Sequence, residues 1–128
     1  MEIITIEYLR EYIESKEMQY IPTQPKLCIP IIKRMCQKIS HGIKFDDIKI
    51  CENLIIDGHH RYLSSLIMGV EIGLVLSHKT SATEMVNWLD VEFVENDWDT
   101  ESKILHLNEL DARYNGLDIE FLKQITSG

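Results

Sequence analysis

The residues of this sequence that are best suited to chemistry lie together, where an apolar run gives way to a helical pattern. Their order is Ile55-Ile56-Asp57-Gly58-His59-His60-Arg61-Tyr62. Gly58 lets the backbone turn sharply and approach a ligand, and the free amides of a helix's first turn favour an anion. Arg61 adds a planar guanidinium that suits two phosphate oxygens, and His59 and His60 add hydrogen-bond donors. The motif therefore predicts a phosphate site made by Gly58, His59, His60 and Arg61.

Asp57, which precedes the predicted helix, has two interpretations. An aspartate in this position can cap the helix by accepting a hydrogen bond from a first-turn amide. Beside a bound nucleotide it also suits a magnesium ion, because Mg²⁺ takes oxygen ligands from carboxylates and phosphates together. A metal site made of protein ligands alone is not expected. His59 and His60 are consecutive and point about 100° apart on a helix, and no further ligand stands at zinc spacing.

Hydrophobic periodicity predicts the elements that position this motif. Helices are expected over 5–16, 29–41, 59–68, 81–89, 100–114 and 118–125, and strands over 18–21, 48–51, 54–56 and 70–76. Thr5 and Asp118 are the expected N-caps of two of these helices, and Ser81 with Glu84 forms a capping box at the start of another. The irregular alternation of strands and helices predicts an α+β fold, a mixed sheet layered with helices.

Length and composition predict one globular domain over residues 1–128. The chain is 45% hydrophobic and 27% charged, which is ordinary for such a domain. It has neither an apolar run of about 18 residues nor a signal-peptide pattern, so a cytoplasmic protein without a membrane span is expected. Cys28, Cys36 and Cys51 are an odd number without a CxxC pair, which favours reduced thiols over a disulfide framework.

The negative charge is confined to the last third of the chain. Residues 1–83 carry equal numbers of acidic and basic side chains, so the whole excess of −8 lies in 84–128. Its densest part is an uninterrupted acidic stretch, formed by Asp90, Glu92, Glu95, Asp97, Asp99 and Glu101. Such a stretch is either a solvated face or a docking surface for a basic protein. Trp88, Phe93 and Trp98 are candidate anchors of that surface and equally candidates for the core.

A longer pattern surrounds the motif. It consists of Ile21-Pro22, a helix over 29–40, His41-Gly42-Ile43, a strand over 48–51, the run from Leu54 to Tyr62, and Gly69. This pattern resembles the ParB/sulfiredoxin superfamily over residues 18–76, with 84–128 as an acidic helical extension outside it. The resemblance implies a mixed sheet with flanking and extra C-terminal helices. It also implies that Gly58, His59, His60 and Arg61 contact the phosphates of a nucleotide such as ATP, ADP or CTP, with magnesium.

The residues of the motif indicate which branch of that superfamily the sequence resembles most. Sulfiredoxins carry a catalytic cysteine where this sequence has His59, and partition proteins carry a GERR-like motif followed by a DNA-binding helical domain, which is replaced here by acidic helices. The closest motif match is to the free serine kinases of the superfamily, which share DGHHR. This match implies phosphoryl transfer with Asp57 as the base, although the loop 22–26 lacks the acidic residue that those kinases carry.

Two functions from different classes follow. The first is a nucleotide- or phosphate-binding domain that acts in phosphoryl transfer or nucleotide hydrolysis, with Asp57 as base and His60 as donor of a proton or hydrogen bond. The alternative is an acidic immunity or inhibitor protein that neutralises a basic toxin through residues 90–101. Binding or cleavage of nucleic acid is not expected, because the acidic charge repels phosphate backbones.

Overall fold

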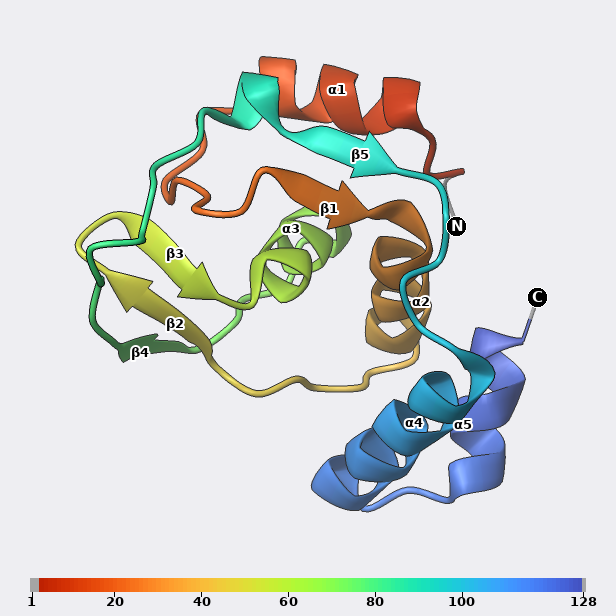
Figure 1. The fold of residues 1–128 in the computed structure, drawn as a ribbon. Coiled ribbons are helices and arrows are strands. Elements are labelled where there is room, and N and C mark those ends of the chain that lie inside the picture. The colour runs from red at the N-terminus through yellow and green to blue at the C-terminus, as the bar shows by residue number, and fades with distance from the viewer. Residues whose placement is uncertain (1–2, 128) are drawn as a thin grey trace.

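Five α-helices and two small sheets make up the part of the chain that the computed structural model describes, residues 3–127 (Figure 1). The helices are α1 (Ile6–Ser15), α2 (Ile29–Ser40), α3 (His59–Met68), α4 (Glu101–Asn115) and α5 (Ile119–Thr126), with one 3-10 turn, η1 (Trp88–Asp90). The strands are β1 (Lys26–Cys28), β2 (Ile48–Cys51), β3 (Leu54–Asp57), β4 (Leu74–Leu76) and β5 (Glu92–Val94). The predicted α+β class is confirmed. Among these helices none has the length and apolar character needed to cross a membrane.

The larger sheet carries the predicted motif at the end of its outer strand. Its strand order is β3-β2-β4, with β2 antiparallel to β3 and parallel to β4. The hairpin between β2 and β3 is tight because Glu52, in the turn, takes a left-handed φ of 56°. The smaller sheet pairs β1 with β5 in parallel, so the last third of the chain supplies a strand as well as helices. An isolated bridge joins Ile21 to Leu54.

One hydrophobic core joins the two sheets. It is built around side chains that are fully buried in α1, α2, β2, β3 and α3, namely Leu9, Ile32, Ile48, Ile55 and Leu63. The helices α2 and α3 pack against each other, and α1 contacts η1. A second, smaller cluster of Ile43, Ala112 and Leu122 seats α4 and α5 beside the chain that follows α2. The motif therefore lies on the larger core, at the junction of β3 with α3.

The predicted helix ends are largely confirmed, because they depend on local chemistry. Thr5 caps α1 by accepting a hydrogen bond from the Tyr8 amide at 3.1 Å. Asp118 caps α5 in the same way through the Glu120 amide, at 3.0 Å. Gly69 ends α3 with a left-handed φ of 69°. The three cysteines are free, as predicted, with two of them buried and Cys51 half-buried.

The predicted helix over 81–89 is wrong, since only its end forms the short turn η1. Two hydrogen bonds to the segment before β1 hold this stretch in an irregular path. The Val86 amide donates to the Pro22 carbonyl at 2.9 Å, and the Trp88 indole donates to the Tyr20 carbonyl at 2.7 Å. Tertiary contacts therefore outweigh the local helical pattern and the expected capping box. The strand predicted over 18–21 is reduced to the bridge at Ile21.

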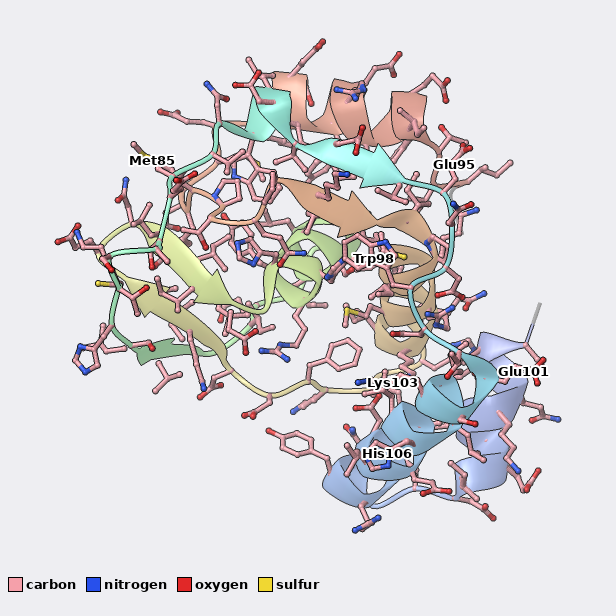
Figure 2. All side chains as sticks on the ribbon, in the orientation of Figure 1. Met85, Glu95, Trp98, Glu101, Lys103 and His106 are labelled. Atoms are coloured by element: carbon pink, nitrogen blue, oxygen red, sulfur yellow. The ribbon has the colours of Figure 1, made fainter. Side chains whose placement is uncertain are left out.

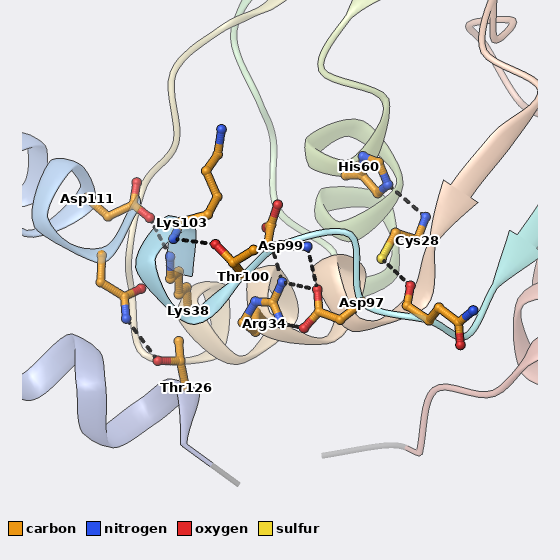
Figure 3. Close-up of polar contacts among 12 residues, drawn as sticks. Cys28, Arg34, Lys38, His60, Asp97, Asp99, Thr100, Lys103, Asp111 and Thr126 are labelled. Atoms are coloured by element: carbon orange, nitrogen blue, oxygen red, sulfur yellow. Dashed lines mark hydrogen bonds and ion pairs between the residues drawn. The ribbon is translucent and has the colours of Figure 1, made fainter. Parts of the chain in front are cut away.

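Ion pairs join the acidic last third of the chain to α2. They involve α4 and the connection that precedes it. Figure 2 shows Glu95 and Trp98 on the connection from β5 to α4, which passes over α2. Lys38 of α2 is buried, with 5% of its surface exposed, and its Nζ lies 2.6 Å from Asp111 Oδ2 of α4 (Figure 3). A buried ammonium needs such a partner, because burial without one is very unfavourable. The contact fixes the position of α4 on α2.

Replacing this lysine is expected to destabilise the protein. Lys38→Met should lower the free energy of unfolding by about 2 kcal/mol, because Asp111 loses its ion-pair partner in a largely buried place, with 20% of its side chain exposed. Urea unfolding measures the effect. The matched control is Lys123→Met, which removes an exposed pair with Glu120 and should change stability by less than about 0.5 kcal/mol. Equal effects of the two substitutions would contradict this prediction.

Candidate functional site

Gly58 forms the corner between β3 and α3. Its φ is 96°, in the left-handed region that favours glycine. A Cβ added there would lie 2.7 Å from Arg61 Nη2 and 2.7 Å from Ile48 Cγ2, so the absence of a side chain lets Arg61 fold back over the corner. Gly58 is also the N-cap residue of α3, and no side chain within residues 3–127 caps this helix. The capping interpretation of Asp57 is therefore wrong, and the first-turn amides receive no cap from a described side chain.

His59 and His60 both turn their Nε2 atoms into the protein. The Thr23 amide donates to His59 Nε2 at 2.9 Å, and the Cys28 amide donates to His60 Nε2 at 2.9 Å. Figure 3 shows the second of these bonds, which joins the start of α3 to the end of β1. The Trp98 ring meets the His60 ring edge-on, with centroids 5.5 Å apart. The two histidines thus hold the loop before β1 and the strand itself against α3.

These hydrogen bonds also determine where the imidazole protons lie. A backbone N–H only donates, so each Nε2 is unprotonated and each neutral ring carries its proton on Nδ1. Burial lowers the pKa of His59 to about 4. Burial, with smaller contributions from the charges of His59 and Arg61, lowers the pKa of His60 to about 4 as well. At pH 7 both rings are neutral, and each offers one Nδ1–H donor that has no hydrogen-bond partner within residues 3–127.

Arg61 is only weakly paired. Its side chain is 24% exposed, and its Nη2 lies 3.3 Å from the Asp47 carbonyl and 3.7 Å from Asp57 Oδ2. Both distances exceed the roughly 2.7–2.9 Å of a charge-assisted hydrogen bond. Its Nε is buried and has no partner in the described chain. Most buried guanidinium nitrogens are hydrogen-bonded, so this group has donor capacity left for a ligand.

A cavity of about 400 Å³ adjoins Arg61, between α2, α4 and the chain that leads into β2. Its walls are mainly apolar and aromatic, formed by Ile31, Met35, Phe45, Leu107, Leu110 and Tyr114. Charged groups complete the lining, and most belong to pairs already described, such as Lys38 with Asp111. Arg34 and Lys38 of this lining each have a close acidic partner, whereas the partners of Arg61 are distant. Sequence reasoning did not find this cavity, because its walls come from segments far apart in the chain.

Two residues of the acidic stretch, Asp97 and Asp99, bind an arginine of the same chain. Asp97 accepts two hydrogen bonds from Arg34, at 2.6 and 2.9 Å, and Asp99 accepts a third at 3.1 Å (Figure 3). The Arg34 guanidinium lowers the pKa of Asp97. Neither carboxylate is therefore free for a basic partner. The other acidic residues of the stretch are exposed, and of these Glu92 pairs with Lys26 at 3.4 Å.

The candidate aromatic anchors divide between the core and the surface. Trp88 and Phe93 are core residues, with 6% and 4% of their surface exposed. Trp98 is 44% exposed and contacts His60, as described. Of the three, only Trp98 lies within reach of both solvent and the motif. The contact of Trp98 with His60 was not predicted, because the sequence contains no local signal that brings this tryptophan to α3.

Asp57 is the exposed carboxylate of this site, with 64% of its side chain accessible. Within residues 3–127, no three His, Cys, Asp or Glu side chains gather in a way that holds a metal ion. A single exposed carboxylate fits a magnesium ion only when phosphate oxygens supply further ligands. The motif thus brings Asp57 and Arg61 together, keeps the backbone amides of His59 and His60 at the same corner, and turns both imidazole Nε2 atoms away.

The fold and the site define an α+β protein with an uncapped helix start beside a weakly paired arginine. A scan against models of protein families, a search of curated proteins and a search of solved structures each returned no match to this chain.

Proposed function

We propose that this protein binds the phosphate groups of a nucleotide at the start of α3, as members of the ParB/sulfiredoxin superfamily do. The observation that carries the proposal is the state of Arg61, a largely buried guanidinium. Among residues 3–127 its Nε has no partner and its Nη2 has only distant ones. Buried charges are normally paired with close partners. In this proposal an anion at the start of α3 becomes the close partner that Arg61 lacks.

The other donors of the corner suit the same anion. The amides of an uncapped first turn carry a partial positive charge, and a phosphate at such a helix start accepts hydrogen bonds from them. His59 and His60 contribute these amides, and their neutral Nδ1–H groups are further donors. Since both rings are uncharged at pH 7, they add hydrogen bonds without adding positive charge. The attraction for the anion then comes mainly from Arg61 and from the helix.

The cavity beside Arg61 suits the rest of a nucleotide. Phe45 and Tyr114 give it aromatic surface, and its size is at the lower end of the range for small-molecule sites. In the proposed complex a base lies against these walls while the phosphates reach the start of α3. Asp57 then holds Mg²⁺ jointly with the phosphates, or accepts a proton from an attacking hydroxyl in phosphoryl transfer. His60 acts as a hydrogen-bond donor, because its low pKa leaves no imidazolium proton to give at pH 7.

Calorimetric titration with ADP, ATP and CTP, with and without Mg²⁺, tests the proposal. We expect binding of at least one of them, and Arg61→Ala should weaken it about 100-fold, since it removes a charge-assisted, two-pronged contact. Arg10→Ala, an exposed arginine of α1, is the matched control and should bind like the native protein. Absence of heat with all three nucleotides, or equal affinities of the two variants, would overturn the proposal. Asp57→Asn distinguishes a catalytic role, as it should retain binding and lose any turnover.

A further inference from the structure

The strand β4 is an unprotected sheet edge. In the described part of the chain it pairs with β2 on one side and with no strand on the other, and all three of its side chains are exposed. Leu74 and Val75 are each 44% exposed, and Leu76 is 82% exposed. In Figure 1 the strand lies at the outer margin of the molecule, on the opposite side from α1. Proteins normally protect an exposed apolar edge, because it can pair with another strand.

The pairing with β2 shows which backbone groups of this edge are free. Ile48 donates to the Gly73 carbonyl at 2.9 Å, and the Ser77 amide donates to the Ile50 carbonyl at 2.7 Å. Because neighbouring residues of a strand direct their backbone groups to opposite sides, Gly73, Val75 and Ser77 face β2. The amides and carbonyls of Leu74 and Leu76 consequently face outward. The contact with β2 extends from 73 to 77, so the available edge is longer than the three residues of β4.

We propose that β4 pairs with β4 of a second copy of this chain, antiparallel and with the two-fold axis at Val75. This register places Leu74 opposite Leu76 of the second copy. The free backbone groups of both residues face outward, so they can form hydrogen bonds across the axis. Continued two residues beyond each end of this edge, the same register brings Glu71 of each copy opposite Lys79 of the other. Opposite charges across an antiparallel pair stabilise it, and here two such pairs form because the interface is symmetric.

Neighbouring registers lack this complementarity. An axis at Leu74 places Glu71 opposite Ser77, and an axis at Leu76 places Lys79 opposite Gly73. An axis between two residues pairs outward-facing groups with inward-facing ones and forms no ladder. The charges just beyond the two ends of the edge therefore select the axis at Val75.

The same register covers the most exposed leucine. Leu74 and Leu76 lie beside Ile48 and Ile50 of β2, on the face of the sheet that packs on the core. Opposite residues of an antiparallel pair have their Cβ atoms about 5 Å apart. Each Leu76 thus contacts the Leu74 of the other copy, and the core face continues across the axis. The dimer has one six-stranded sheet in the order β3-β2-β4-β4-β2-β3.

Sedimentation of the full chain over concentrations up to about 1 mM, at low salt, tests this dimer. Glu71→Lys alone places lysine opposite Lys79, and Lys79→Glu alone places glutamate opposite Glu71. Each single variant should therefore dimerise about tenfold more weakly. Mixing the two variants restores both opposite-charge pairs in a heterodimer, so the mixture should associate as well as the native protein. Both residues are exposed, and circular dichroism of each variant checks that it folds.

Glu11→Lys, the same charge change on α1, is the matched control and should leave dimerisation unchanged. Lys79 also pairs with Glu52 at 3.1 Å, so the comparison relies on the restoration by mixing and not on the Lys79 variant alone. A protein that stays monomeric up to about 1 mM overturns the proposal. A dimer that neither single variant weakens, or that the mixture fails to restore, overturns the register and with it the proposed interface.

Discussion

The free energy of unfolding is expected to fall by about 4 kcal/mol when the pH is lowered from 7.5 to 5, through His59 and His60 alone. Burial lowers the pKa of each to about 4, against 6.5 in the unfolded chain. As the pH falls below 6.5 the unfolded state takes up protons that the native state accepts only near pH 4. The contribution of the two histidines to the free energy of unfolding is therefore fully present above pH 6.5 and is lost between pH 6.5 and pH 4. By pH 5 the loss is about 2 kcal/mol for each histidine.

Urea unfolding at pH 7.5 and pH 5 measures this loss, which is a large part of the stability of an ordinary domain. His60→Gln lowers stability at pH 7.5, but it should remove about half of the difference between the two pH values, since one titrating group is gone. His106→Gln, an exposed histidine of α4, controls for replacing a histidine as such and should keep the full difference. If His60→Gln keeps the full difference as well, His60 is not buried in its neutral form.

Gly58→Ala is expected to lower the free energy of unfolding by about 3 kcal/mol. A left-handed φ of 96° costs about 1 kcal/mol for alanine, and the new Cβ adds overpacking of about 2 kcal/mol. The overpacking comes from Ile48 Cγ2, at 2.7 Å, because Ile48 is fully buried and has no room to move. Arg61 can swing away, and this movement would also remove the arginine from the corner that we propose binds phosphate.

Gly69→Ala separates these two causes. Gly69 also has a left-handed φ, of 69°, but an added Cβ meets no atom within 4 Å. Its substitution should lower the free energy of unfolding by only about 1 kcal/mol in the same urea experiment. If the two variants are equally stable, the close contact at Gly58 does not exist, and the folded-back position of Arg61 loses its explanation.

The elements that the sequence predicts well are those whose causes are local. The helix α1 begins after a capping threonine, α3 ends at a left-handed glycine, and the hairpin between β2 and β3 follows from two apolar runs around a short polar turn. Each of these signals lies within a few residues of the structure it determines. The same is true of Gly58, whose place between a strand and a helix is visible in the motif itself.

The structural features that the sequence missed depend on contacts between distant segments. The strands β1 and β5 are three residues each, too short for a periodic pattern, and they form because they pair with each other. The irregular stretch before η1 follows from hydrogen bonds to residues 20–22. In the site, nothing local indicates that the Thr23 and Cys28 amides hold the two imidazoles, or that Arg34 engages the acidic stretch. The sequence therefore predicted the corner between β3 and α3, but it did not predict the contacts that the side chains of this corner make with the rest of the protein.

The parallel pair of β1 and β5 also has a consequence for the way this chain reaches its native state. The two strands are separated by about half of the sequence, so the small sheet closes a long loop, which is entropically expensive and slow to form. During synthesis, β1 leaves the ribosome well before its partner exists. The helix α3 and the β2–β3 hairpin can form in the meantime from near neighbours. Final closure, and with it the seating of α1 beside η1, waits until the second half of the polypeptide has emerged.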